Sequence, residues 1–413
     1  MQNRNLLILA GTAALMLVAG LTLTRQQAPQ SDARAADQPL LPALSTKLGS
    51  LDAVTITEGG GKVAIELKRE GERWVLANKD GYPADVAQLR SYLGKLADAK
   101  LREQKTSNPE RHAALGVEAV DQTDARGLMV TLGGIDPPVK LITGSLSTAG
   151  AAGTFVRFAE DPQSWLASGT LRPETALANW IPAEIVNLPA NRLQSATITA
   201  PDGAVLTVAK NDPADANWTI QDVPRGKEPN SEFAGNVLTS TPDNLRLDDV
   251  LKAEGVEPEG EVWRARYVSF DGVAVTLELW QREGKDHARV GAEVDEARFN
   301  AWLEAEVAKQ QASQAMAKQI AEQSNAAAAG EATAPGGEGA TEGAAEAAAA
   351  DEGKTRLTLE PPPFDEAKFR EEKAAGVRGE VEGIRTRTAD WVYVIPSWKA
   401  ENVRKRMADL LKS

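Results

Sequence analysis

Two histidines, His112 and His287, are the only imidazole groups in this chain, and the chain contains no cysteine. Acidic residues lie near each histidine in the sequence, but they form no helical i, i+4 pair of metal ligands. We therefore expect both histidines at the surface or in turns, and we predict no metal site. The lack of cysteine excludes disulfides, thiolate chemistry, cysteine-ligated metals and a lipoprotein anchor.

The sequence also lacks the motifs of common nucleotide and hydrolase sites. It has no G-x-x-x-x-G-K-[ST] phosphate loop and no G-x-S-x-G nucleophile elbow. Gly59 to Gly61 form a predicted turn, and no histidine has a spacing that implicates Ser145 or Ser147. Asp and Glu total 59, but their spacing singles out no carboxylate pair. We predict no catalytic residue, no cofactor site and no enzyme, and keep a carboxylate-dependent hydrolase as an alternative.

Tryptophan is another residue type that could serve a function, because the chain contains nine Trp but only four Tyr. Trp74 and Trp218 occupy equivalent predicted strand positions, and Trp165 and Trp398 occupy equivalent corners, so we expect these four in the core. The remaining candidates could contact a glycan or a protein if exposed. They have no counterpart elsewhere in the chain and are Trp180, Trp263, Trp280 and Trp302.

A repeat in the sequence indicates which elements must position these side chains. The stretch 54–57 (VTIT), followed by Trp74, is echoed by 196–199 (ATIT), followed by Trp218. Residues 115–118 (LGVE) are similarly echoed by 254–257 (EGVE), at an offset of about 140 residues. A repeat of this length predicts two copies of one globular module.

The first module is predicted at residues 44–176 and the second at 177–290 plus 376–413. In the first, residues 54–57 and 63–67 alternate like half-buried strands. They precede a helix after Pro83 whose apolar side faces the sheet through Leu89, Leu93 and Leu96. Further strands follow, and Asp161 with Pro162 predicts a closing helix. The second module has a shorter helix near 230–233 and a late strand at 391–395.

An insertion at residues 291–375 separates the two parts of the second module. Its beginning, 296–324, is helix-prone, and its middle, 325–350, is almost entirely Ala, Gly, Glu and Thr. Such a composition cannot bury enough apolar surface to order itself, so we predict a flexible acidic loop or a frayed helix. The last strand must then return across the insertion.

Residues 6–24 predict attachment to a membrane. The stretch is free of charge and, as a helix, would span about 28 Å, close to a bilayer core of about 30 Å. Arg4 precedes it, which predicts a cytoplasmic N-terminus and a periplasmic bulk. We predict an inner-membrane, single-pass signal-anchor at 1–25 and a polar tether at 26–43. A cleaved signal peptide is the alternative, because Ala33-Arg34-Ala35 resembles a cleavage site.

The charge balance narrows the range of partners. The net charge is −13 and no basic tract stands out, which argues against nucleic acid and against docking on anionic lipid. Basic residues do gather in the closing helix, where we expect a solvated outer face. They are Lys399, Arg404, Lys405, Arg406 and Lys412.

Together these features resemble a bacterial family known as domain of unknown function 4340. The resemblance is carried by the anchor, the strands leading to Trp74, the LGV motif at 115–117, the FVR strand at 155–157 and the final WVYVIP at 391–396. It spans nearly the whole chain outside the Ala/Gly-rich insertion. Members of the family are envelope proteins whose genes often lie beside a gliding-type ABC transport system. The family contributes no catalytic residues.

The expected fold class is therefore α+β: an N-terminal transmembrane helix followed by two tandem repeated modules, each an antiparallel β-sheet with a covering helix. The resemblance implies a membrane-anchored periplasmic accessory protein that contacts an ABC transporter permease and auxiliary subunit. A periplasmic glycan- or peptide-binding module is the alternative, and no ligand is identified.

Overall fold

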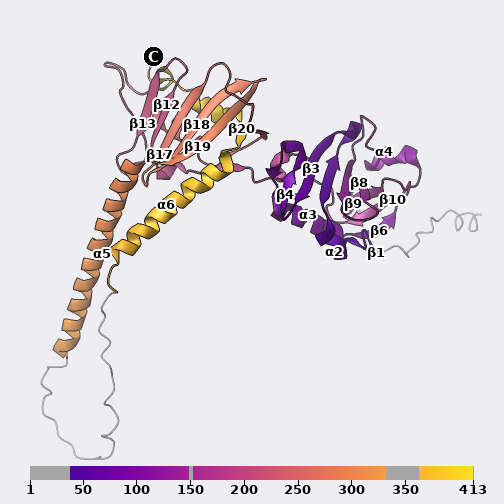
Figure 1. Cartoon of the computed structure of the whole chain (residues 1–413), viewed down its shortest axis with the longest axis horizontal. Coiled ribbons are helices and arrows are strands. Elements are labelled where there is room, and N and C mark those ends of the chain that lie inside the picture. The colour runs from indigo at the N-terminus through magenta and orange to yellow at the C-terminus, as the bar shows by residue number, and fades with distance from the viewer. Residues whose placement is uncertain (1–37, 148–151, 332–361, 413) are drawn as a thin grey trace, which may run out of the picture. The chain divides into compact units, whose positions relative to one another are not determined.

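The computed structural model of the chain describes residues 38–147, 152–331 and 362–412 (Figure 1). Two compact units divide the chain, the first ending at Pro182 and the second beginning at Ala183. Each is built around a large antiparallel sheet. The predicted anchor at 1–25, and the tether as far as residue 37, lie outside the described residues.

The first unit contains a sheet of ten strands in which neighbours run antiparallel. The alternation predicted along 54–57 and 63–67 is confirmed, because Val54, Ile56, Ile65 and Leu67 are all fully buried. A turn at Gly59–Gly61 joins these strands, as predicted. In spatial order the strands are β1 (Gln38–Pro39), β6 (Lys100–Gln104), β10 (Ser164–Ser168), β9 (Gly153–Phe158), β8 (Val139–Ser147), β7 (Leu128–Gly133), β2 (Ala53–Thr57), β3 (Val63–Glu70), β4 (Arg73–Leu76) and β5 (Tyr82–Pro83).

Helix α3 (Val86–Asp98) is the main helix of this unit; α2 (Leu44–Lys47) and α4 (His112–Leu115) are single turns. It begins later than predicted, because Pro83 belongs to β5 and Asp85 is the N-cap, accepting a hydrogen bond from the backbone N–H of Gln88 at 3.0 Å. Its buried side contains Leu89, Leu93 and Leu96, as predicted, together with Tyr92. The Tyr92 ring packs edge-on against Trp180 at 5.4 Å, which joins the helix to the end of the unit.

The closing helix predicted after Asp161 is wrong. Residues Ser164–Ser168 form β10, which pairs with β9 on one side and β6 on the other. Asp161 accepts a hydrogen bond from the backbone N–H of Gln163 at 2.8 Å, so it stabilises a turn instead of a helix start. The helix signal is local, whereas strands on both edges provide hydrogen-bond partners for the backbone of this segment, and the strand forms instead.

The second unit contains an eight-stranded antiparallel sheet and a separate two-stranded ribbon. The final strand returns across the insertion as predicted, since β20 (Trp391–Ile395) pairs with β19 (Lys285–Val294) and with β16 (Asp249–Lys252). The ribbon comprises β11 (Glu184–Val186) and β15 (Leu245–Arg246). In spatial order the large sheet comprises β14 (Thr219–Ile220), β13 (Val205–Ala209), β12 (Leu193–Thr199), β17 (Trp263–Ser269), β18 (Val273–Arg282), β19 (Lys285–Val294), β20 (Trp391–Ile395) and β16 (Asp249–Lys252).

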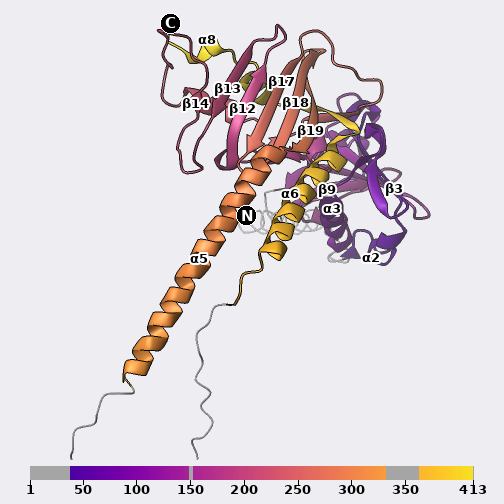
Figure 2. The ribbon, with the colours of Figure 1, turned by 60° about the vertical axis from the view of Figure 1, so that its left-hand side comes forward.

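Two long helices leave this sheet and run side by side (Figures 1 and 2). α5 (Glu296–Glu331) includes the stretch predicted to be helix-prone, and α6 (Glu366–Thr388) leads back to β20. Residues 332–361, which hold much of the predicted flexible loop, lie outside the described residues. The chain ends in two short helices, α7 (Ser397–Val403) and α8 (Met407–Leu410).

The predicted fold class is wrong. The described chain is β-rich, and its two large sheets differ in strand order and in their helices. The helix expected near 230–233 is instead a 3₁₀ helix at Ala234–Thr239. The second sheet is covered by α6, which begins within the predicted insertion and continues past its predicted end at residue 375. Alternating apolar residues identify strands, but they do not determine which strands pair or which helix covers them.

None of the helices in residues 38–147, 152–331 and 362–412 combines the length and apolar character needed to span a bilayer. The predicted transmembrane segment, 6–24, lies outside these residues.

Candidate functional site

A groove of about 600 Å³ lies on the second sheet beside the C-terminal end of α6. We call it the arginine groove, because three guanidinium groups line it. Its polar lining residues come from β12, β17, β18, β19 and the end of α6. They are Thr197, Thr199, Arg264, Arg266, Thr276, Glu278, Arg289 and Thr388.

Strand register brings these side chains to one face of the sheet. Arg264 lies opposite Glu278, and Glu278 lies opposite Arg289, on three successive strands. Side chains alternate between the two faces along a strand. The intervening Ala265 and Leu277 are accordingly buried in the core, at 3% and 1% exposure. The same alternation that builds the core therefore places a polar ladder on the opposite face.

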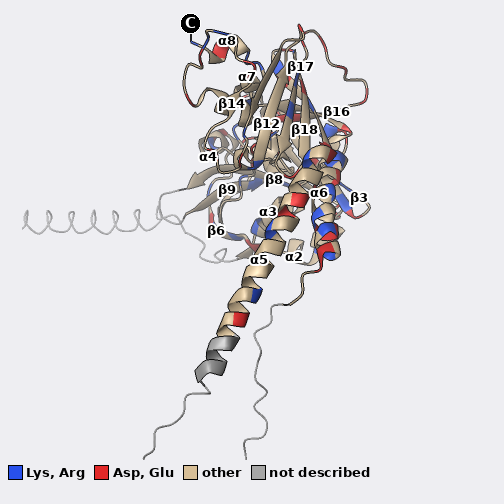
Figure 3. Cartoon of the chain, turned by 90° about the vertical axis from the view of Figure 1, so that its left-hand side faces the viewer, with Lys and Arg blue, Asp and Glu red and all other residues tan. Residues whose placement is uncertain are grey.

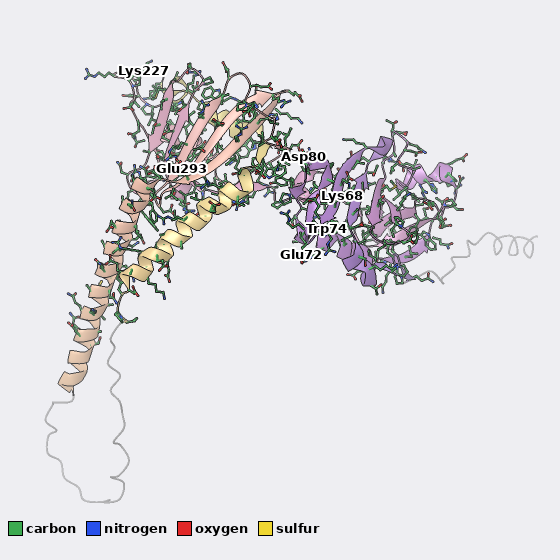
Figure 4. The ribbon with its side chains drawn as sticks, in the orientation of Figure 1. Lys68, Glu72, Trp74, Asp80, Lys227 and Glu293 are labelled. Atoms are coloured by element: carbon green, nitrogen blue, oxygen red, sulfur yellow. The ribbon has the colours of Figure 1, made fainter. Side chains whose placement is uncertain are left out.

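Carboxylates hold the groove arginines in place. Glu278 accepts a hydrogen bond from Nε of Arg264 at 3.1 Å and lies 3.9 Å from Nη1 of Arg289. Arg266 pairs with Glu293 and, at 3.1 Å, with Asp295. Glu293 lies at the end of β19, near the base of α5 (Figure 4). Exposed pairs of this kind contribute little stability, so their main effect is to hold the guanidinium groups in position.

Arg192 fastens α6 to the sheet. Its guanidinium bonds Asp271 through Nη2 at 2.6 Å and Glu380 of α6 through Nη1 and Nη2 at 2.8 and 2.7 Å. Burial alone would lower the pKa of Arg192, but the hydrogen bonds to Glu380 and Asp271 and the two negative charges raise it overall. The double bridge complements the buried side of α6, which consists of Val377, Val381, Ile384 and Thr388.

We call α5, together with the part of α6 that pairs with it, the arm. Arg370 of α6 donates from Nη1 and Nη2 to Glu304 of α5 at 2.8 and 2.9 Å and from Nε to Glu366 at 2.8 Å. These bonds raise the pKa of Arg370. The two-pronged geometry fixes the angle between the helices better than a single contact would. Gln311 adds a hydrogen bond to Glu366 at 3.0 Å.

The outer part of α5 exposes apolar side chains. Met316 is 65% exposed and Ile320 is 55% exposed. They are four residues apart, so they are neighbours on one face of the helix. Figure 3 shows charges of both signs along α6, whereas Lys318 is the one charged residue at positions 312–321 of α5. The arm thus presents a small apolar face in a weakly charged region.

The prediction that both histidines lie at the surface or in turns is wrong, because both are buried, His112 in α4 and His287 in β19. His112 is 4% exposed, and its Nε2 donates to the carbonyl oxygen of Pro162 at 2.8 Å. His287 is 5% exposed and stacks on Trp280 with ring centroids 5.9 Å apart. They belong to different units. Their local sequences are polar and gave no sign of burial, which results from the strands and loops that surround them.

The other residues singled out from sequence lie apart from the groove. Ser145 and Ser147 belong to β8 of the first unit, and part of the small-residue loop after them, 148–151, lies outside the described residues. Among described residues, no cluster of three or more His, Asp or Glu is arranged to hold a metal ion. Sequence reasoning missed the groove because its polar side chains reach one face only through the register of the paired strands.

Tryptophan placement differs from the prediction in both directions. Trp218 is buried as expected and Trp74 is half-buried on β4 (Figure 4), but Trp398, predicted in the core, is 60% exposed. Of the four Trp proposed as contact residues, Trp302 is half-buried and the other three are buried. Those three are Trp180 at 1%, Trp263 at 6% and Trp280 at 0% exposure. Ring stacking with a glycan therefore has few accessible indoles to use.

The basic residues of the closing segment do not all lie on a solvated face. Lys399 is only 5% exposed, and its ammonium donates to the carbonyl oxygens of Ser240 and Asp243, the latter at 2.6 Å. Arg404 pairs with Asp286, which is 2% exposed. The predicted outer face is wrong for these two residues.

The buried Lys399 predicts a pH dependence of stability. Burial lowers its pKa below the ordinary 10.5, and the charge of Asp243 opposes this shift only in part. Between the folded pKa and 10.5 the unfolded chain binds more protons, so the free energy of unfolding should rise with pH. Lys399→Met should remove this rise in urea denaturation at several pH values. Lys318→Met, at an exposed position, should keep it; an unchanged slope in Lys399→Met would contradict the assignment.

Comparison with known proteins supports the resemblance inferred from sequence. The family model described as domain of unknown function (DUF4340) matches residues 74–261, less than half of the chain. The match runs from β4 of the first unit to just before β17 of the second. No curated protein and no solved structure matches the chain.

Proposed function

We propose, from the resemblance to the DUF4340 family over residues 74–261, that this protein is an accessory component of a bacterial envelope complex. It is held at the inner membrane through residues 6–24, with the bulk of the chain in the periplasm. It acts by protein–protein contact, without catalysis. The proposed partners are the permease and auxiliary subunit of an ABC-type transport system.

The arm is the observation that carries this proposal. α5 is 36 residues long, or about 54 Å at 1.5 Å per residue. Its base is tied to α6 by Arg370, and its outer part exposes Met316 and Ile320. A stiff projecting helix with apolar side chains four residues apart suits contact with a partner helix. Polar groove residues alone would not explain why such a helix extends from the sheet.

We expect the double substitution Met316→Glu and Ile320→Glu to abolish the partner contact. It places two charges on the apolar face, where burial against a partner would leave them unpaired. The measurement is a mild-detergent pull-down of the tagged full-length protein, with mass spectrometry of the recovered permease and auxiliary subunit. Recovery of both should fall about tenfold or more, corresponding to at least about 1.4 kcal/mol.

The matched control is Gln319→Glu with Gln323→Glu, which adds the same two charges at the same spacing on exposed positions of α5. This control should recover the partners as the wild type does. Equal losses in both variants would mean that charge on the helix matters and the apolar face does not. Recovery of the wild-type protein alone would remove the accessory role.

Binding of a polar ligand is the second candidate function, and the arginine groove favours it. Three guanidinium groups and four threonines face a volume of about 600 Å³, within the range of small-ligand sites. The buried tryptophans make a peptide a better fit than a glycan. A carboxylate-dependent hydrolase stays as a third alternative, with no described residue singled out for it. Failure of the pull-down would direct ligand screening to the groove.

A further inference from the structure

A second cavity, of about 520 Å³, lies in the first unit near the LGV motif. We call it the Glu118 cavity. Its lining comes from the segment around α4 and from the turn between β9 and β10. It includes Glu118, His112 and Arg157, whose side chains are all at least nine-tenths buried in relative terms.

Glu118 has an unsatisfied carboxylate oxygen. The residue is 6% exposed, and its Oε1 accepts a hydrogen bond from the backbone N–H of Arg126 at 2.7 Å. Its Oε2 is shielded from solvent and has no hydrogen-bond partner among the described residues. A buried acceptor without a donor is unfavourable, more so when it is charged, and native proteins rarely keep one without a reason. A bound group that donates to Oε2 would supply that reason.

Arg157, the guanidinium group that lines the cavity, already has hydrogen-bond partners. Nε of Arg157 donates to the carbonyl oxygen of Val117 at 2.8 Å, and Nη1 donates to those of Phe158, Ala159 and Asp161 at 3.2, 3.0 and 3.2 Å. Burial lowers the pKa of Arg157, and the charges of Asp161 and Glu118 oppose that shift. Arg157 therefore serves chiefly to hold the loops that frame the cavity.

The charge around the cavity favours a cation. Four carboxylates line it, those of Glu110, Glu118, Glu160 and Asp161, against the single guanidinium of Arg157. His112 adds an acceptor, because its Nε2 donates to the carbonyl oxygen of Pro162 and a neutral ring then has Nδ1 unprotonated. Among the described residues no metal-binding cluster is present. The acceptors suit a group that carries several N–H donors.

We propose that the Glu118 cavity binds the primary ammonium group of a small organic cation, with Oε2 of Glu118 as its principal acceptor. An ammonium carries three donors and a positive charge, so it satisfies both the orphaned oxygen and the excess of carboxylates. A water molecule would satisfy the oxygen but would add no positive charge to balance the excess of carboxylates that line the cavity. This inference is independent of the proposed accessory role.

The exposed side chain of Arg126 is the group that an ammonium would displace to reach Glu118. The side chain of Arg126 is 66% exposed, and its Nε lies 4.0 Å from Oε1 of Glu118. It also donates from Nη2 to the carbonyl oxygen of Ala113. An exposed side chain can move without disturbing the core, so an entering ammonium can replace Arg126 as the charge partner of Glu118. Because this contact is an ion pair, binding of the ammonium to Glu118 should weaken at high salt concentration.

The test is isothermal titration of the full-length protein in mild detergent. The probes are 1,5-diaminopentane, a capped lysine tripeptide and the uncharged 1,5-pentanediol. At least one amine should bind and the diol should not. Preference for the diamine identifies a free amine as the source, and preference for the tripeptide identifies a peptide side chain. Absence of binding by both amines at millimolar concentration overturns the proposal.

Glu118→Gln separates the carboxylate charge from the shape of the side chain. It should weaken amine binding about tenfold or more, while Glu160→Gln should stay within about twofold, because Glu160 lines the same cavity but is 88% exposed. Ala113→Phe provides a second test in case Glu118→Gln does not fold. The phenyl ring fills the cavity from an exposed lining position, so this variant should abolish amine binding. Equal affinity in folded Glu118→Gln, or undiminished binding in Ala113→Phe, overturns the assignment.

Discussion

Gly144→Ala should destabilise the first unit by about 3 kcal/mol, the upper part of the range for overpacked sites. A Cβ at this position would lie 2.3 Å from the carbonyl oxygen of Leu115 and 2.7 Å from that of Gly116. These are backbone atoms, so no side-chain rotation relieves the clash. The absence of a side chain at Gly144 allows the LGV motif to pack closely against β8.

Hydrogen exchange with mass spectrometry measures this effect unit by unit. Peptides of the first unit should lose protection in Gly144→Ala, while those of the second should keep it. Gly94→Ala is the matched control, because Gly94 lies within α3 and a Cβ there meets nothing within 4 Å. It should stabilise α3 by about 0.5–1 kcal/mol. Equal protection in Gly144→Ala and the wild type would refute the clash.

Arg192→Ala should lower the free energy of unfolding of the second unit by about 2 kcal/mol. Removing one partner of a fully buried pair costs about 3–5 kcal/mol. The exposed fractions of Arg192, Asp271 and Glu380, at 30%, 17% and 33%, reduce that figure. The substitution leaves two carboxylates without a cation where α6 meets the sheet, so α6 should become the least protected element of the unit.

Urea denaturation and hydrogen exchange of α6 peptides test the Arg192 prediction. The control is Arg378→Ala on the same helix, whose side chain is 62% exposed and pairs with Glu296 only at 3.9 Å. Its effect should stay within about 0.5 kcal/mol. If both variants lose the same free energy of unfolding, the loss reflects the removal of any positive charge at α6. The hydrogen bonds of Arg192 to Asp271 and Glu380 would then have no special role.

Residue pattern alone was enough to predict most of the strands. Alternation at 54–57 and 63–67 identified β2 and β3 with their buried sides, and the late strand at 391–395 was recognised despite the long insertion before it. The spacing of Leu89, Leu93 and Leu96 likewise identified the buried side of α3. These signals are local, because a strand or helix period is complete within a few residues.

The candidate sites were not predictable in the same way. Glu118 gives no sequence sign of its burial, and Oε2 becomes an orphan only when the loops around Arg157 close over it. Arg264, Glu278 and Arg289 form a ladder only through the register of β17, β18 and β19. A shift of one residue in any of these strands would send its side chain to the core.

The sequence by itself determined where apolar and polar residues alternate, where the chain turns and which residue types are absent. It also determined the resemblance to the DUF4340 family. Only the tertiary structure decided that 164–168 is a strand, that α6 packs on the second sheet and that His112 is buried. The physical reason is the separation along the chain of the residues that interact. Periodicity acts within an element, whereas strand partners, helix placement and burial depend on residues brought together from distant parts of the chain, which no local pattern encodes.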